Sequence, residues 1–300
     1  MNAPQSVVPA DATAGLGRRA GARRDRPVLV IRPPDSLWAR MPDHLRRLPE
    51  YGDLLYTLSL HRINVRYRQT VLGVLWAVLQ PVLMMLIFTV VFSMLARMPS
   101  DGVPYALFAY TALLPWTFFA SSVTNATTSL VSHTQLITKV YFPREILPLT
   151  YVIVGFFDFA IGLVVLGALM TWFDVPFTLQ ILHLLPLLLL LGAWLLAVAL
   201  FLSAAQVRWR DIGVAMPVLL QFWMFASPVI YPLSLVPEAW RSLYMLNPMT
   251  GIISSFRDVL LQGAQPDPVP LRYALVVTVC ALPAAYLYFK RAEATMADVV

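Results

Sequence analysis

The chain has 300 residues, of which 59% are hydrophobic and 13% are charged, and its formal net charge is +6. Soluble domains carry about 25% charged residues, so this composition excludes an ordinary soluble globular protein. Uncharged runs of 18 or more residues are typical of membrane-spanning helices. We therefore expect one all-α, polytopic membrane domain with a polar N-terminal arm. The single cysteine, Cys280, excludes a disulfide within the chain, and the four histidines do not have metal-ligand spacing.

The first 45 residues are rich in Ala, Pro and Arg and have no apolar periodicity. This composition predicts a mostly disordered, basic cytoplasmic tail, which we delimit as residues 1–49. No apolar segment of signal length follows its "RRAGARRDR" stretch. We therefore favour attraction to anionic lipid over a twin-arginine export signal.

Residues 50–69 predict an amphipathic helix with a basic end. Its predicted apolar face carries Tyr51, Leu54, Leu55 and Leu58, and its basic end carries Arg62, Arg66 and Arg68. Such a helix directly before an apolar run is typical of a helix that lies in the membrane interface.

Six apolar segments follow, in a membrane domain that covers residues 70–300. We place them near residues 71–96, 104–131, 146–173, 181–206, 212–233 and 273–289. The first five are long enough to cross about 30 Å of hydrocarbon. The last is short, and the charged side chains at its ends, Arg272 and Lys290, could reach the two interfaces.

The distribution of Lys and Arg predicts the orientation of the six spans. With the N-terminus in the cytoplasm, eighteen of the 22 basic residues lie on the inside and four lie on the outside. Cytoplasmic segments of membrane proteins carry the excess of Lys and Arg. We therefore expect both termini in the cytoplasm and residues 133–148, "HTQLITKVYFPREILP", in the first cytoplasmic loop.

Residues 234–270 are neither a span nor a plain loop, because they alternate apolar and charged residues. Pro237 stands where a helix can start, and the "NP" pair at 247–248 breaks that helix. The stretch "TGIISSFRDVLLQG" then predicts a second short amphipathic helix that ends at Gly263. We expect two short helices that re-enter the outer face without crossing the membrane.

Several energy sources and chemistries are disfavoured by what the sequence lacks. A phosphate-binding loop G-x-x-x-x-G-K-[ST] is absent, since Lys139 follows Thr138 and Lys290 follows Phe289. Only Asp158 lies well inside a span, which argues against an ion-driven carrier. Asp158 is either functional or hydrogen-bonded to a neighbouring helix, and we favour the second. The spans hold no paired carboxylates and no His–Asp pair, so an intramembrane enzyme is disfavoured.

Polar and aromatic residues in the spans are candidates for a water-filled path. The stretch "SSVTNATTS" at 121–129 carries hydroxyl groups that could face a channel or a helix interface. Broad aromatic faces suit the apolar faces of sugar rings, although an ordinary aromatic belt at the membrane surface remains the alternative. The pore-lining candidates are Trp76, Gln80, Gln221, Phe222, Trp223, Phe225 and Tyr231.

Three stretches together resemble one known family. "HRINVRYRQTVLGVLWAVLQP" at 61–81, "ITKVYFPREILPL" at 137–149 and "NPMTGIISSFRDVLLQG" at 247–263 are similar to the membrane subunits of type-2 ABC exporters of cell-surface polysaccharides. These exporters move O-antigen, capsule or teichoic-acid chains. The resemblance spans residues 61–263 and does not extend to the first 45 residues.

The resemblance implies a homodimer with six membrane helices per subunit and two separate ATPase subunits, which would bind the ATP and Mg²⁺. It implies no cofactor in this chain and no nucleic-acid partner. The first cytoplasmic loop would form a coupling helix in a cleft of the ATPase, where Tyr141 and Phe142 would anchor and charged residues would set the register. The coupling residues implied are Gln135, Leu136, Lys139, Tyr141, Phe142, Pro143, Arg144 and Glu145.

The resemblance also implies that residues 50–69 lie where a lipid-linked substrate enters. Arg62, Arg66 and Arg68 could meet the pyrophosphate of a polyprenyl carrier, and simple attraction to anionic phospholipid is the equal alternative. The first and fifth spans of both subunits would line the pore.

We therefore predict a permease of the bacterial inner membrane that exports a lipid-linked, O-antigen-like polysaccharide with the help of a partner ATPase. Two alternatives remain. The first is a type-2 ABC permease for a small drug or lipid, against which the stretches at 61–81 and 137–149 argue. The second, less favoured, is an intramembrane lipid-modifying enzyme.

Overall fold

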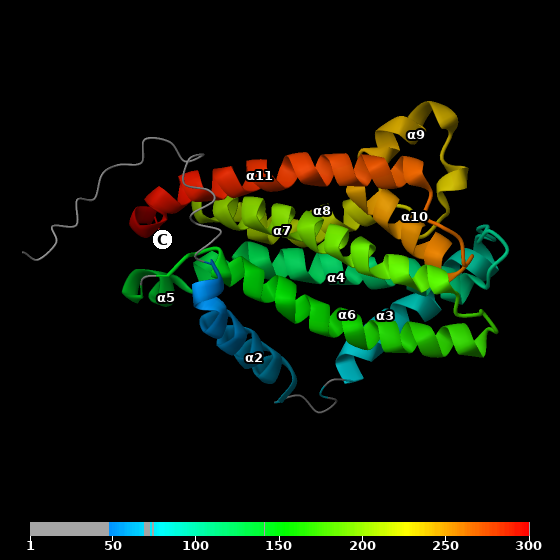
Figure 1. The fold of residues 1–300 in the computed structure, drawn as a ribbon, viewed down its shortest axis with the longest axis horizontal. Helices are drawn as coiled ribbons and strands as arrows, with labels where there is room; N and C mark the ends of the chain where they lie inside the picture. The colour runs from blue at the N-terminus through cyan, green and yellow to red at the C-terminus, as the bar shows by residue number, and fades with distance from the viewer. Residues whose placement is uncertain (1–47, 69–72, 74, 141, 300) are drawn as a thin grey trace, which may run out of the picture. The chain divides into compact units, whose positions relative to one another are not determined.

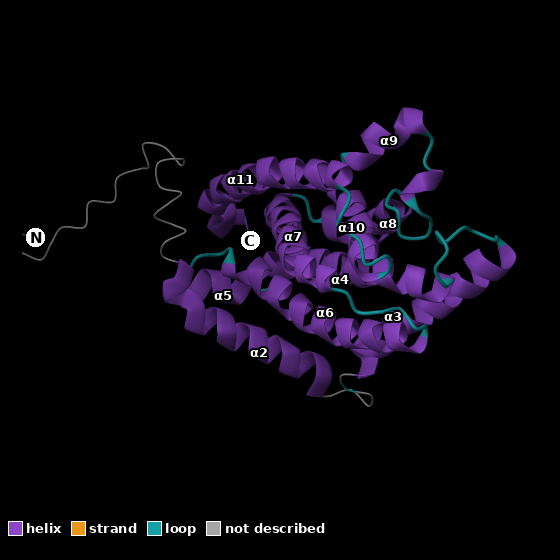
Figure 2. Cartoon of the chain, turned by 45° about the vertical axis from the view of Figure 1, so that its right-hand side comes forward, coloured by secondary structure: helices purple, strands orange, loops and turns teal. Residues whose placement is uncertain are grey.

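The computed structural model describes residues 48–68, 73, 75–140 and 142–299. These residues belong to one compact unit, Ser36–Val300. Every regular element in the described ranges is a helix (Figure 2). The all-α expectation is therefore confirmed for this part of the chain, whereas the predicted tail lies outside the described residues up to residue 47.

Five stretches of helix are long and apolar enough to cross a membrane. The first combines α3 (Leu75–Phe88) with a π-helical turn, η2 (Thr89–Leu95). The next two are α4 (Tyr105–Ser132) and α6 (Ile146–Trp172). The fourth joins η3 (Leu179–His183) to α7 (Leu184–Arg208), and the fifth lies in α11 (Pro268–Val299).

The remaining elements are shorter. They are η1 (Leu48–Tyr51), α2 (Gly52–Arg68), α5 (Thr134–Lys139), α8 (Asp211–Phe225), η4 (Leu233–Leu235), α9 (Glu238–Met245) and α10 (Pro248–Leu260). α5 and the C-terminal end of α11 lie together, and we call this the α5 end (Figure 1). α9 and α10 lie at the opposite end, which we call the α10 end.

The expected lengths of the fifth and sixth apolar segments are wrong. α8 has 15 residues and therefore a length of about 22 Å, which is less than the hydrocarbon thickness of about 30 Å. Two prolines, Pro228 and Pro232, follow the end of the helix within "ASPVIYPL", and each lacks the backbone N–H that would extend the helical hydrogen bonds. α8 accommodates one other proline, Pro217, in its interior. α11, expected to be short, has 32 residues. Asp267 caps the N-terminus of α11, because its side chain accepts a hydrogen bond from the Val269 N–H at 2.9 Å.

The main apolar core surrounds α4, which packs against α6 and α7 and also contacts α3, α8 and α10 (Figure 1). Two glycines of α6 allow the close approach of α4. A Cβ atom on Gly155 would lie 2.1 Å from Ser122 Oγ, and one on Gly162 would lie 2.3 Å from Leu114 Cδ1. Small residues at such crossings are how helices pack tightly in a membrane.

A second apolar cluster lies at the α5 end. Its buried members include Ile137, Phe142 and Phe289. The predicted apolar face of α2 packs against this cluster through Tyr51, Leu54, Leu55 and Leu58. The prediction of one apolar face is thus confirmed, and its partner is the protein's own α5 end.

The two short helices expected in residues 234–270 are α9 and α10. α9 follows Pro237, and Asn247 caps α10 by accepting a hydrogen bond from the Met249 N–H at 3.1 Å. The Asn247 side chain also donates to the Ala226 carbonyl oxygen at 3.1 Å and to Ser227 Oγ at 2.8 Å. Asn247 therefore joins the broken end of α8 to the start of α10.

Arg257 completes this junction from inside the core. Its side chain is buried and donates hydrogen bonds to the carbonyl oxygens of Pro228 at 2.6 Å and Val229 at 2.8 Å. It also donates to the Phe108 carbonyl at 3.4 Å, and its guanidinium lies 3.4 Å from the Phe108 ring centroid. Burial lowers the pKa of Arg257 to about 9, so the side chain stays protonated at neutral pH.

We expect Arg257→Leu to destabilise the protein strongly. The substitution would leave the carbonyl groups of Pro228 and Val229 without the donor they have in this structure, and each unsatisfied buried polar group costs about 1–3 kcal/mol. The expected loss is therefore roughly 3 kcal/mol or more, measured as thermal unfolding of the purified protein in detergent. Arg272→Leu is the matched control, since Arg272 is exposed and, among the residues that the structure describes, bonds only to a carbonyl of its own helix. Equal melting of the two variants would contradict the role of Arg257.

Candidate functional site

The loop between α4 and α6 presents a short exposed edge at the α5 end. α5 has six residues, and its Ile137 faces the second apolar cluster together with Leu136. The exposed residues of this edge are Gln135, Thr138, Lys139 and Val140. Because the other face is held by the core, the edge is a fixed surface available to another protein.

Phe142 does not belong to that exposed edge. Its side chain is only 6% exposed and packs in the second apolar cluster. The expectation that it inserts into a partner's pocket is therefore wrong for this structure, because the chain's own core already occupies its ring. Its neighbour Tyr141 lies outside the described residues. Pro143 is half-buried.

The charged residues that follow Phe142 are also engaged within the chain. Glu145 is 4% exposed, and its Oε2 atom accepts a hydrogen bond from Lys290 Nζ at 2.8 Å. Lys290 Nζ also donates to Glu293 Oε2 at 2.8 Å. Arg144 donates through Nη1 to the Glu293 carbonyl oxygen at 2.7 Å. Both side chains thus fasten the loop to α11, which leaves Glu145 buried. Arg144 is half-buried, and its expected contact with an ATPase stays a prediction.

We expect Lys290→Met to destabilise this junction by about 3–5 kcal/mol, because it leaves the buried Glu145 carboxylate without its cation. The double variant Lys290→Met/Glu145→Gln should recover most of that loss, since neither charge then remains. Thermal unfolding in detergent measures both. Lys139→Met, at an exposed lysine, should change stability by no more than about 0.5 kcal/mol. If the single and double variants proved equally unstable, charge burial would not be the cause.

The predicted basic end of α2 lies against α6. Arg66 Nη1 is 2.6 Å from Asp158 Oδ2, and the Tyr67 hydroxyl donates to the other carboxylate oxygen of Asp158. Asp158 is therefore hydrogen-bonded to a neighbouring helix, which was the favoured expectation. Atoms Nε and Nη2 of Arg66 have no hydrogen-bond partner among the described residues, and the side chain is 42% exposed.

Arg62 holds α2 in a second place. Its guanidinium carbon lies 3.8 Å from the centroid of the Tyr151 ring. Its Nη2 atom is 3.4 Å from His133 Nε2, and His133 Nδ1 is 2.8 Å from the Ser129 carbonyl oxygen. Burial, with the charge of Arg62, lowers the pKa of His133, which fits a neutral imidazole that accepts from Arg62. Arg68, by contrast, is exposed.

A cleft of about 460 Å³ opens beside this contact, between α3, α4, α6 and α8. Arg66 and Asp158 line it. So does Gln80, the predicted pore residue of the first span, together with polar residues of the "SSVTNATTS" stretch: Ser121, Thr124 and Asn125. Most of the remaining lining is apolar. The charged side chains of the cleft, Arg66 and Asp158, lie where α2 meets α6.

The other pore candidates divide into two groups. Trp76, Gln221, Phe222 and Phe225 are exposed in the single chain. Trp223 and Tyr231 are half-buried, and the expectation that they face a path stays a prediction. Trp223 packs edge-on against Phe119 and Trp194 and donates to Asn247 Oδ1 at 3.1 Å. The Tyr231 hydroxyl donates to the Phe225 carbonyl oxygen and lies 2.7 Å from the Tyr244 hydroxyl.

Sequence reasoning missed three residues that form these contacts: Tyr67, which bonds Asp158, Lys290, which bonds Glu145, and Glu293, which bonds Lys290. Lys290 was treated only as a charge at the end of the last span, and Glu293 and Tyr67 were not singled out. One signal was available: Lys139 and Lys290 are the only lysines of the chain. A lysine directly after an apolar span, with Glu293 one turn later, indicates a cation that needs a carboxylate partner. No group of three metal-binding side chains occurs within the ranges that the structure describes.

We expect the Arg66–Asp158 pair to couple only weakly, by about 0.5–1 kcal/mol, because Arg66 is well exposed and solvent screens the pair. A double-mutant cycle with Arg66→Gln, Asp158→Asn and their combination measures this coupling as differences in unfolding free energy. Arg68→Gln is the control, with no expected change. Additivity of the two single changes within error would exclude a stabilising pair.

Comparison with known proteins gives the family. The model of the ABC-2 type transporter family matches residues 53–261. The chain belongs to this family. An O-antigen export system permease protein, RfbA, of Myxococcus xanthus is 32% identical over 263 residues, which cover 85% of this chain and 98% of the relative.

More distant relatives include a protein of the same name from Klebsiella pneumoniae. It is 28% identical over 214 residues, which cover 70% of this chain and 81% of the relative. The polysialic acid transport protein KpsM of Escherichia coli is 22% identical over 247 residues, which cover 80% of this chain and 93% of the relative.

Proposed function

We propose that this chain is the transmembrane subunit of an exporter that moves a lipid-linked, O-antigen-like polysaccharide across the bacterial inner membrane. The observation that carries the proposal is the similarity to an O-antigen export permease along 98% of that relative's length. The chain has no phosphate-binding loop of the G-x-x-x-x-G-K-[ST] type, so the energy comes from ATP hydrolysed by separate partner subunits.

The exposed edge of α5 is the surface proposed for the ATPase. Lys139 offers a charge and Val140, which is 51% exposed, offers an apolar contact. Apolar anchors at an interface commonly contribute more than exposed ion pairs. Gln135 and Thr138 extend the same edge, while Phe142, Arg144 and Glu145 support it from inside the chain.

A second copy of the chain is the proposed neighbour of α3 and α8. α3 exposes Trp76, Leu83, Leu86 and Ile87, and α8 exposes Val214, Val218, Leu219 and Phe222. These faces either meet lipid or meet their counterparts in a second copy. Because α8 is too short to cross alone, pairing around a shared path gives it a protected environment, and Gln80 and Gln221 supply polar side chains there.

The orientation proposed for this exporter places both termini and the α5 end in the cytoplasm, as the eighteen-to-four distribution of basic residues favours. The α10 end then faces outward. Arg66 and Arg68 are the arginines of α2 that keep exposed guanidinium groups for the phosphates of a lipid carrier. Arg62 instead holds α2 against Tyr151 and His133.

The test is complementation of a strain that lacks this gene, with surface polysaccharide and intracellular lipid-linked glycan measured together. The native chain should restore surface polysaccharide and clear the intracellular glycan. Val140→Glu should block export and ATPase co-purification because it puts a charge at an apolar contact, whereas Ser132→Glu, at another exposed position nearby, should be tolerated. Normal surface polysaccharide without the chain, or ATP hydrolysis by the purified chain alone, would contradict the proposal.

A further inference from the structure

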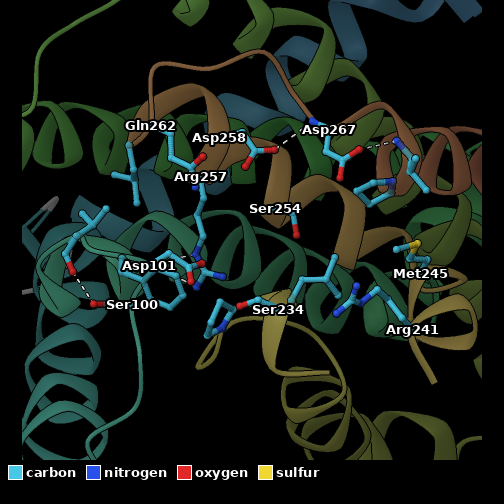
Figure 3. Close-up of a pocket in the computed structure, with 17 residues that line it drawn as sticks. Ser100, Asp101, Ser234, Arg241, Met245, Ser254, Arg257, Asp258, Gln262 and Asp267 are labelled. Atoms are coloured by element: carbon cyan, nitrogen blue, oxygen red, sulfur yellow. Dashed lines mark hydrogen bonds between the residues drawn. The ribbon is translucent and has the colours of Figure 1, made fainter. Parts of the chain in front are cut away.

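A second cavity, of about 430 Å³, lies at the α10 end, apart from the cleft that Arg66 and Asp158 line (Figure 3). Its walls come from α10, from the α9 region and from the segments before α4 and α11. Ligand sites in proteins commonly have volumes of about 300–1,000 Å³. The cavity is therefore large enough for a small organic ligand.

Three of its charged residues, Arg257, Asp258 and Asp267, form hydrogen bonds within the chain. Arg257 is held by the carbonyl groups of Pro228, Val229 and Phe108. Asp258 Oδ2 accepts a hydrogen bond from the Asp267 N–H at 3.1 Å, and Asp267 Oδ1 accepts from the Val269 N–H at 2.9 Å. Figure 3 shows the two aspartates bonded in this way beside the cavity. These three side chains form part of the cavity wall and carry charge, but their hydrogen bonds are to other groups of the chain.

Five other polar side chains of the wall keep bonding capacity for a ligand. The side chains of Asp101, Ser234, Ser254 and Gln262 have no hydrogen-bond partner among the described residues. Within the described ranges, Arg241 donates once, through Nη2 to the Val236 carbonyl at 3.3 Å, and its buried Nε atom has no hydrogen-bond partner there. A buried N–H without a partner is costly, and a ligand oxygen would satisfy it.

The charges of the wall select the class of ligand. An anion would meet the carboxylates of Asp101, Asp258 and Asp267, and a cation would meet the guanidinium groups of Arg241 and Arg257. A neutral ligand with many hydroxyl groups avoids both repulsions. Each hydroxyl can donate to a carboxylate and accept from an arginine or amide.

We propose that this cavity binds a neutral sugar, and that Asp101 and Arg241 are its principal contacts. The assignment of that sugar to a segment of the exported chain rests on the proposed function. The α10 end is opposite the α5 edge proposed for the ATPase (Figure 1), so the cavity lies where an exported glycan emerges. A bound segment there would resist return of the chain toward the cytoplasm.

The experiment measures saturation-transfer NMR of two sugar probes with the complete transporter in lipid nanodiscs. One probe is a set of short neutral oligosaccharides released by mild acid from the strain's own surface polysaccharide, and the other is maltose. Saturable transfer to the first probe alone assigns the site to the exported chain. Transfer to both assigns a general neutral-sugar site. Glucuronate and glucosamine should compete poorly, because each carries a charge that the wall repels.

Two substitutions test the contacts. Asp101→Asn and Arg241→Gln should each weaken binding about tenfold, which is the loss expected for a hydrogen bond to a charged group. Asp174→Asn is the matched control for the first, since Asp101 and Asp174 are both exposed and both have left-handed backbone, with φ of 50° and 56°. Asparagine tolerates that conformation. Arg97→Gln, at an exposed arginine outside the cavity, is the control for the second.

Two results would overturn the proposal: no saturable transfer to either probe, or transfer that is unchanged in both Asp101→Asn and Arg241→Gln. If Arg241→Gln fails to fold, Ser254→Ala provides a second change in the same wall. Export in cells is measured separately for each variant. A native chain that exports glycan but binds neither probe refutes the sugar site and leaves the proposed function intact. A chain that binds maltose but exports no glycan refutes the proposed function instead.

Discussion

The α10 end depends on one constraint: a helix that stops inside a membrane protein leaves carbonyl groups that need donors. α8 stops at Phe225, short of the length of a span. Arg257 supplies N–H groups to Pro228 and Val229 just beyond the stop and to Phe108 on α4. A guanidinium suits this task because its planar fork holds several donors in fixed directions. Without it the break in α8, the position of α10 and the wall of the proposed sugar cavity would all lose their support.

At the α5 end, the buried group that needs a partner is a carboxylate, and a lysine side chain supplies the partner. Its loop turns back into α6 through Glu145, whose buried carboxylate needs a cation, and Lys290 of α11 provides it. The same helix begins beside α10, where a Cβ on Gly251 would lie 2.3 Å from the Pro270 carbonyl oxygen. α11 has 32 residues and so a length of about 48 Å. One continuous helix therefore holds Arg144 and Glu145, behind the proposed ATPase edge, at one end and lines the proposed sugar cavity at the other.

Features that depend on neighbouring residues could be predicted from the sequence, whereas contacts between residues far apart in the chain could not. Apolar runs and helix breaks are local, so the spans of α3, α4, α6 and α7, the apolar face of α2 and the Asn247–Pro248 break could be predicted. The roles of Phe142, Glu145 and Trp223 could not, because their partners are remote in sequence. Lys290 lies 145 residues from Glu145. An aromatic pair flanked by charges has the same pattern whether it faces a partner protein or its own core.

The two arginine contacts of α2 differ in strength, and that difference bears on how the proposed exporter admits its substrate. Arg62 lies over Tyr151 and against a neutral His133, in a partly buried setting where burial lowers its pKa. Arg66 meets Asp158 through one nitrogen and is 42% exposed. Exposed pairs of this kind contribute about 0–1 kcal/mol, so a phosphate with more negative charge can replace the carboxylate at small cost. Under the proposed function, Arg62 therefore keeps α2 in place while Arg66, at the mouth of the cleft, is the arginine that can exchange Asp158 for a lipid phosphate.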